Sequence, residues 1–173
     1  YIIPPIHHTI NKNPTAKNIL FLGDFVYFMI IMSNFVERLD ELMFDNQLTV
    51  KMLTKEINIQ RATINRYLSG EVLPSLQTAV KLADLFHCSV DYLLGLTNTT
   101  PDSFLPCPPF AERLKFLLEH FHCTQYRLYT YGDFPPSAVP NWLHGKYTPS
   151  LDNVVKIAKF FDRSVDFILG REK

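Results

Sequence analysis

The chain has 173 residues, of which 47% are hydrophobic and 20% are charged. This composition is typical of a globular protein rather than a disordered one, and the length fits one medium domain or two small ones. The formal net charge is +0, so the chain lacks the overall basic excess common among nucleic-acid binders. Any contact with nucleic acid must therefore come from a local patch of positive charge.

The first 32 residues contain the most apolar run of the chain, ILFLGDFVYFMIIM at 19–32. The run is too short for a membrane span, includes Asp24, and lacks the charged start and cleavage site of a secretory signal. No membrane contact is expected. Because Met32 directly precedes the unit described next, residues 1–32 have two interpretations. They are either a poorly ordered upstream extension or a hydrophobic arm used for dimer contact.

From Phe35 onward the sequence repeats itself after 75 residues. Residues 35–95 align with residues 110–170 without a gap, and 21 of the 61 aligned positions are identical. The matches include Gly70 with Gly145 and Pro74 with Pro149. A gapless register of this kind indicates a duplicated unit. We therefore predict domain 1 at 33–96, a Pro-rich linker at 97–109 and domain 2 at 110–173.

Each domain is predicted to be a bundle of five helices. In domain 1, apolar residues recur at helical spacing, as in Phe35, Leu39 and Leu42. Residues able to cap a helix N-terminus precede these segments, namely Ser33 or Asn34, Thr49, Ser75 and Ser89. Asn58 suits a tight turn and Gly70 suits a helix end. No stretch alternates with a period of two for long enough to form a strand, so the predicted fold class is all-α.

The segment LTVKMLTKEINIQRATINRYLSGEVLPSLQTAVKLADLFHCSVDYLLG resembles the helix-turn-helix domain of phage-repressor-type, Xre/Cro-like transcription regulators. Those domains place a recognition helix after a short second helix, followed by a Gly, a Pro-Ser-Leu and a closing S-x-D-Y-L-L-G. Domain 2 matches equally well after Leu143 and less well before it. The resemblance implies two tandem five-helix domains in a sequence-specific regulator, a repressor, that binds double-stranded DNA. It also implies a bacterial or phage-encoded protein that acts in the cytoplasm at the nucleoid.

Helical geometry predicts which side chains of the third helix face outward. With Ile64, Tyr67 and Leu68 buried, the candidates for reading bases are Arg61, Ala62, Asn65 and Arg66. Arginine can contact O6 and N7 of guanine, and asparagine can contact N6 and N7 of adenine. The resemblance places Arg61, Ala62 and Arg66 at base-reading positions of the family.

Phosphate contacts are expected at the edges of the same helices. The candidates are Thr49, Lys51, Gln60 and Ser69. The family often has Gln at the first position of the second helix, and this chain departs from that pattern with Val50. Residues 49–70 carry a net charge of +3, which supports DNA contact better than the charge of the whole chain does.

Domain 2 is not equivalent in this region. Its third-helix segment reads FPPSAVPNWLHG, and residues 124–145 carry no net charge. Its polar candidates are Gln125, Ser137, Asn141 and His144. The linker is long enough, at about 3.1 Å per residue, to let both domains reach half-sites about 34 Å apart. Domain 2 is thus either a weak second reader or a pairing surface for a homodimer or partner protein, and its lack of charge favours pairing.

An alternative from another functional class is a protein-interaction module. It would dock a partner through the aromatic residues of domain 2, which are Tyr126, Tyr129, Tyr131, Phe134 and Trp142. The chain has no G-x-S-x-G motif, no phosphate loop and no paired catalytic carboxylates, so no enzyme is predicted. No cofactor and no metal are predicted either, because the HFHC run at 120–123 lacks further ligands nearby. The three cysteines form no C-x-x-C pair, which is typical of reduced thiols in a cytoplasm.

Overall fold

The structure is a computed structural model that describes residues 14–101 and 103–172, with side chains from Phe25 onward. It contains ten helices and, within those residues, no strand. The predicted all-α class is therefore confirmed. Residues 1–13 of the predicted N-terminal arm lie outside the described residues.

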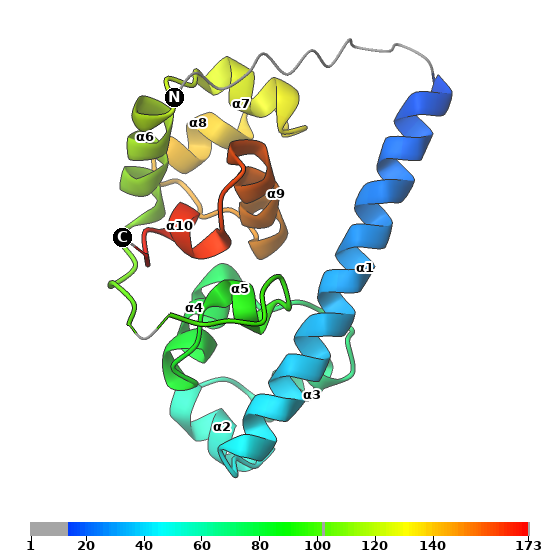
Figure 1. The fold of residues 1–173 in the computed structure, drawn as a ribbon, viewed down its shortest axis with the longest axis vertical. Helices are drawn as coiled ribbons and strands as arrows, with labels where there is room; N and C mark the ends of the chain where they lie inside the picture. The colour runs from blue at the N-terminus through cyan, green and yellow to red at the C-terminus, as the bar shows by residue number, and fades with distance from the viewer. Residues whose placement is uncertain (1–13, 102, 173) are drawn as a thin grey trace.

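The helices follow the duplicated order expected from the sequence (Figure 1). The first five are α1 (Pro14–Asp45), α2 (Val50–Ile57), α3 (Arg61–Leu68), α4 (Leu76–Leu85) and α5 (Val90–Leu93). The second five are α6 (Phe110–His120), α7 (Gln125–Tyr131), α8 (Ala138–Leu143), α9 (Leu151–Phe161) and α10 (Val165–Leu169). The two sets belong to domains 1 and 2.

The duplication extends to the backbone conformation. Every residue with positive φ in the described chain has a partner 75 positions away with the same property, and all these angles lie between 48° and 74°. The pairs are Gln47 and His122, Asn58 and Asp133, Gly70 and Gly145, His87 and Asp162, and Gly95 and Gly170. Left-handed residues mark the ends of helices, so both domains turn at the same places. The expected turn at Asn58 is confirmed.

The helix caps repeat in the same way. The hydroxyl groups of Thr49, Ser75 and Ser89 each accept a hydrogen bond from the backbone N–H three residues later. Their counterparts do the same in domain 2, and they are Thr124, Ser150 and Ser164. These bonds satisfy N–H groups that have no partner inside the helix. Three of the four predicted caps, at Thr49, Ser75 and Ser89, are therefore confirmed.

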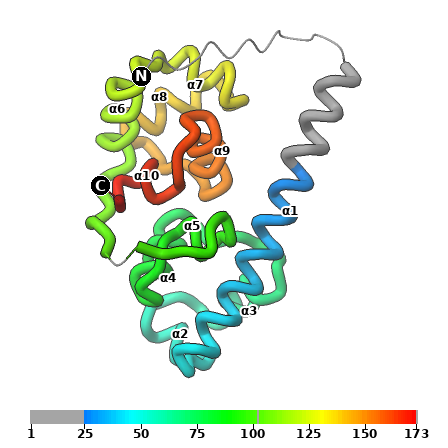
Figure 2. Tube along the Cα trace, viewed as in Figure 1, coloured from blue at the N-terminus to red at the C-terminus, as the bar shows by residue number. Residues whose placement is uncertain are grey.

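The predicted cap at Ser33 or Asn34 is wrong, because α1 runs through both residues and begins at Pro14. The reason lies in the buried stripe of this helix. Ile31 is buried, as are Phe35 and Leu39, so the spacing of four residues continues upstream of the repeat. Farther upstream in α1, Tyr27 contacts domain 2, and the Nζ atom of Lys159 lies 3.1 Å from the centre of the Tyr27 ring. Figure 2 shows α1 continuing beyond domain 1 on the side of the molecule where α9 lies.

Each third helix is anchored by one large aromatic residue. In α3, Tyr67 is buried and meets the ring of Phe35 edge-on, with ring centres 6.1 Å apart. In α8, Trp142 occupies the equivalent position and meets Phe134 in the same manner at 5.2 Å. Ile64 is also buried, on the inner face of α3. The opposite face of α3 is therefore turned to solvent.

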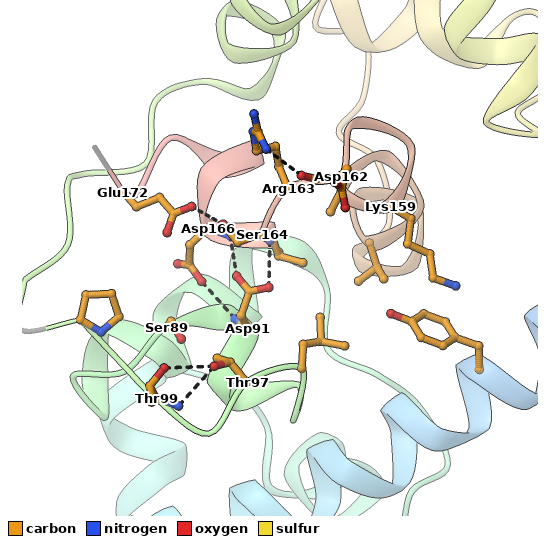
Figure 3. A pocket seen from close by; sticks show the side chains of 16 residues that line it. Ser89, Asp91, Thr97, Thr99, Lys159, Asp162, Arg163, Ser164, Asp166 and Glu172 are labelled. Carbon is orange, nitrogen blue, oxygen red and sulfur yellow. Dashed lines mark hydrogen bonds between the residues drawn. The ribbon is translucent and has the colours of Figure 1, made fainter. Parts of the chain in front are cut away.

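The two domains are docked against each other rather than joined only by the linker. Helices α5 and α10 meet between them (Figure 1). A cleft of about 480 Å³ lies beside this contact, with walls from α1, α5, α9 and α10 (Figure 3). The linker also packs on domain 2, since the Leu105 N–H donates to the Arg171 carbonyl at 2.7 Å. The relative placement of the domains is thus held by several contacts.

Candidate nucleic-acid interface

The outward face of α3 carries all four residues predicted to read bases. Arg61, Ala62, Asn65 and Arg66 are exposed, while Ile64 and Tyr67 face the core. The predicted amphipathic division of this helix is therefore confirmed, apart from Leu68, which is half-buried. The reading role itself stays a prediction.

Arg61 is the first residue of α3, and its side chain has no ion pair or hydrogen bond with any described residue. Gln60, before it, has extended backbone and makes no side-chain cap. The first N–H groups of a helix lack partners within the helix and carry partial positive charge. The tip of α3 therefore presents a guanidinium group, an amide group and backbone donors to solvent.

Arg66 is in a different situation. Its Nε donates to Glu71 Oε2 at 3.1 Å, and the two side chains are 54% and 59% exposed. The Ser69 hydroxyl lies 3.1 Å from the other oxygen of the same carboxylate. An ion pair this exposed contributes little to stability and can exchange partners readily. Glu71 therefore holds both of these predicted DNA-contacting side chains through its carboxylate.

Glu71 was not among the residues predicted from the sequence, although it contacts two of the predicted site residues. The count of charges that gave a net +3 covered residues 49–70 and stopped one residue before it. The signal that could have revealed it was its position, because a chain that turns at Gly70 brings the next residue back toward the end of α3. The Glu71 N–H does bond to the Arg66 carbonyl at 3.0 Å.

The N-terminal end of α2 supplies the remaining phosphate candidates. The Thr49 hydroxyl accepts from the Met52 N–H at 3.3 Å, which leaves its own proton free to donate. Lys51 is exposed in the first turn of α2 and has no described ion pair. Both groups can therefore serve an anion without breaking an existing contact of their side chains.

Thr49→Ala is expected to lower the free energy of unfolding of domain 1 by about 1 kcal/mol, because the capping bond is lost. Thr124→Ala removes the same bond from domain 2 and is the matched control. Thermal unfolding should show similar losses for the two variants. DNA titrations should then show a larger further loss for Thr49→Ala than for Thr124→Ala, and equal affinities would contradict a phosphate role for Thr49.

The equivalent surface of domain 2 is built differently. Helix α8 begins at Ala138, and the positions that match Arg61 and Ala62 are Pro136 and Ser137, ahead of the helix. Pro140 falls in the first turn, where a missing N–H costs least, as the sequence reasoning expected. The recognition tip is therefore shorter and carries no cation.

The four polar candidates of domain 2 lie on this surface but are less available. Gln125 and Ser137 are exposed. Asn141 is half-buried and its amide donates to the Tyr147 hydroxyl at 3.5 Å, while His144 Nδ1 lies 2.6 Å from the Pro140 carbonyl. The structure thus groups these residues on one face but ties two of them to local partners.

The aromatic residues proposed as an alternative docking surface do not form one continuous patch. Phe134 and Trp142 are buried in the core of domain 2, whereas Tyr126 and Tyr131 are 61% and 51% exposed. Tyr129 is half-buried. Burial of the two largest groups removes much of the apolar surface that such docking would use.

Among the described residues, no group of three or more His, Cys, Asp or Glu side chains is arranged to hold a metal ion. Among the described helices, none has both the length and the apolar character needed to cross a membrane.

Comparison with known proteins agrees with this architecture. The model of the helix-turn-helix family matches residues 45–93 and again residues 114–168. The chain is also similar to YobD of Bacillus subtilis (strain 168), described as an uncharacterized HTH-type transcriptional regulator. The identity is 36% over 98 residues, which cover 54% of this chain and 81% of the relative. No solved structure matches the chain. The chain belongs to the helix-turn-helix family and contains two tandem copies of its domain.

Proposed function

We propose that this protein is a sequence-specific, DNA-binding regulator of transcription that reads the major groove with α3 of domain 1. Arg61 is the principal reader, assisted by Ala62, Asn65 and Arg66. Thr49, Lys51, Gln60 and Ser69 hold the flanking phosphates. The protein acts in the cytoplasm, at the DNA, and represses by occupying its site.

The observation that carries this proposal is the exposed guanidinium group of Arg61 at the tip of α3, which pairs with no described residue. In a helix-turn-helix, the N-terminal residues of the second helix of the motif contact base edges. A guanidinium group fits the paired acceptors O6 and N7 of guanine, and it stays charged at any physiological pH. The membership of both segments in the helix-turn-helix family supports the same role.

Local charge supports the proposal as well. The exposed cations Lys51, Lys55 and Arg61 lie on α2 and α3. Half of the acidic side chains of domain 1 lie instead on α1, at Glu37, Asp40, Glu41 and Asp45. A face with an excess of positive charge attracts the phosphate backbone and orients the protein before any base is read.

A titration against duplex DNA at two salt concentrations tests the function. Neutralising three phosphates predicts a loss of roughly 40-fold in affinity between about 50 and 200 mM salt. The site itself should come from selection of bound sequences out of a random pool. A chain with no affinity for any duplex at the lower salt would contradict the proposal.

Glu71→Gln is expected to strengthen binding several-fold. The substitution releases Arg66 and Ser69 and removes a negative charge that repels phosphate. Glu56→Gln is the matched control, since it removes an exposed charge from α2 that has no described ion pair. Equal gains in affinity for the two variants would mean that only the overall electrostatic field around the protein matters. Arg66 would then make no DNA contact of its own.

A further inference from the structure

The contact between the domains joins equivalent positions of the two copies. Asp91 in α5 and Asp166 in α10 stand 75 residues apart. The Asp91 N–H donates to Asp166 Oδ2 at 3.0 Å, and the Asp166 N–H donates to Asp91 Oδ2 at 2.8 Å (Figure 3). In an interface with two-fold symmetry, residue i contacts residue j and j contacts i. The single chain therefore contains the internal contact of a two-fold dimer.

This contact is buried, and the N–H groups at the start of α10 in domain 2 have hydrogen-bond partners in it. Asp91 and Asp166 are only 8% and 1% exposed. The second oxygen of Asp91 accepts from the Val165 N–H at 2.9 Å, so one carboxylate serves the first two N–H groups of α10. Carboxylates suit helix N-termini because these carry partial positive charge. Separation of the domains would expose all of these groups together.

Arg171 adds a second link between the domains. Its side chain is 1% exposed, and it binds Asp166 at 2.9 Å and Asp84 of α4 at 2.6 Å. The equivalent position in domain 1 is Leu96, so this link has no symmetric counterpart. The domains are held in one arrangement by groups from both sides.

The two-fold relation places the two helix-turn-helix units in equivalent surroundings. Figure 1 shows α3 and α8 on opposite sides of the contact between α5 and α10. The units differ in what they present at the tip. Domain 1 offers Arg61 and Ala62 there, whereas domain 2 offers Pro136 and Ser137. Domain 2 keeps two exposed cations near these helices, Arg127 in the first turn of α7 and Lys146 just after the C-terminal end of α8, and these can meet phosphates.

We infer that one chain, without a second copy, occupies an asymmetric DNA site. One half of the site is read by α3, and the adjoining half lies against α7 and α8 and is held through phosphates without being read. The pairing face of domain 1 is already covered by domain 2, so no second chain is needed to complete the two-fold arrangement. This inference rests on the proposed function and assigns the kind of DNA site that it uses.

Selection from a random DNA pool, followed by the mass of the complex on the selected duplex, tests the inference. The expected result is one constrained half-site beside an unconstrained one, with one 20.1 kDa chain per duplex. A palindromic sequence holding two chains would overturn it. A failure to enrich any sequence would instead contradict the proposed function.

A backbone cleavage footprint with the Asp91→Ala variant gives a second, independent measurement. In the wild-type complex, protection should cover both halves of the site. In the variant, protection of the unread half should be lost, while protection of the read half should persist and show that domain 1 remains folded. A wild-type footprint confined to the read half would overturn the inference.

Discussion

Replacing Arg61 by alanine should weaken binding to the selected DNA site by roughly 5- to 150-fold, or about 1–3 kcal/mol. The substitution removes a side chain without described partners from an exposed helix tip, so the fold should be unaffected. Competition experiments with single-base variants of the site should show that one base preference disappears.

Lys115→Ala is a suitable control for this prediction. Lys115 is an exposed cation on α6, on the far side of the α5–α10 contact from α3 (Figure 1). Its loss should change affinity far less than the loss of Arg61. If Arg61→Ala weakened binding to every duplex equally, Arg61 would contact the backbone and another residue would have to read the bases.

Asp91→Ala should separate the two domains. The substitution removes the acceptor of the Val165 and Asp166 N–H groups, and each donor left unsatisfied in a buried contact costs about 1–3 kcal/mol. The docking equilibrium should therefore fall by roughly 30-fold or more. Amide hydrogen exchange at Val165 and Asp166 measures it directly. Asp40→Ala, which removes an exposed carboxylate of α1, should leave that exchange unchanged.

The same contact should depend on pH. Burial, and then the hydrogen bond with the Asp166 carboxyl, raise the pKa of Asp91 from 3.8 to about 7. A raised pKa means that the docked state binds the proton more tightly than the separated state. Docking is thus favoured at low pH, weakens as the pH rises toward 7 and changes little above that. Between pH 6 and 8 the loss should be about tenfold.

The groups that face Asp91 define the controls for this titration. Asp166 faces it from α10, and Tyr27 of α1 lies close enough for the Asp91 charge to raise the pKa of Tyr27, after the larger effect of burial. Arg171 stays cationic throughout this range. Asp91→Asn should flatten the dependence, measured from the amide chemical shifts of Val165 and Asp166. Equal docking at pH 6 and 8 in the wild-type chain would contradict the assignment.

The features predictable from the sequence are those fixed over a few residues. Thr49, Ser75 and Ser89 cap helices because a hydroxyl group at that position reaches an N–H group three residues on. The buried stripe of α3 follows from helical periodicity alone. The same caps recur 75 residues later in domain 2, at Thr124, Ser150 and Ser164.

The features that were not predicted depend on contacts between residues far apart in the sequence, or on where a helix begins when the chain offers more than one possible start. Helix α1 continues past Ser33 because Ile31 packs into the core, which outweighs a favourable capping residue. The repeat aligns Asp91 with Asp166, and this match can be read from the sequence. The contact between the two residues cannot, because it depends on how the domains dock. The pairing of Arg66 with Glu71 depends on a turn that returns the chain to the end of α3.

The most direct test of the account replaces guanine by 7-deazaguanine, one position at a time, within the read half of the selected site. This change removes only the N7 acceptor that a guanidinium group would share with O6. At one position, the wild-type chain should lose affinity and Arg61→Ala should bind the altered and unaltered duplexes equally. If Arg61→Ala lost as much affinity as the wild-type chain at every sensitive guanine, α3 would not read DNA through Arg61.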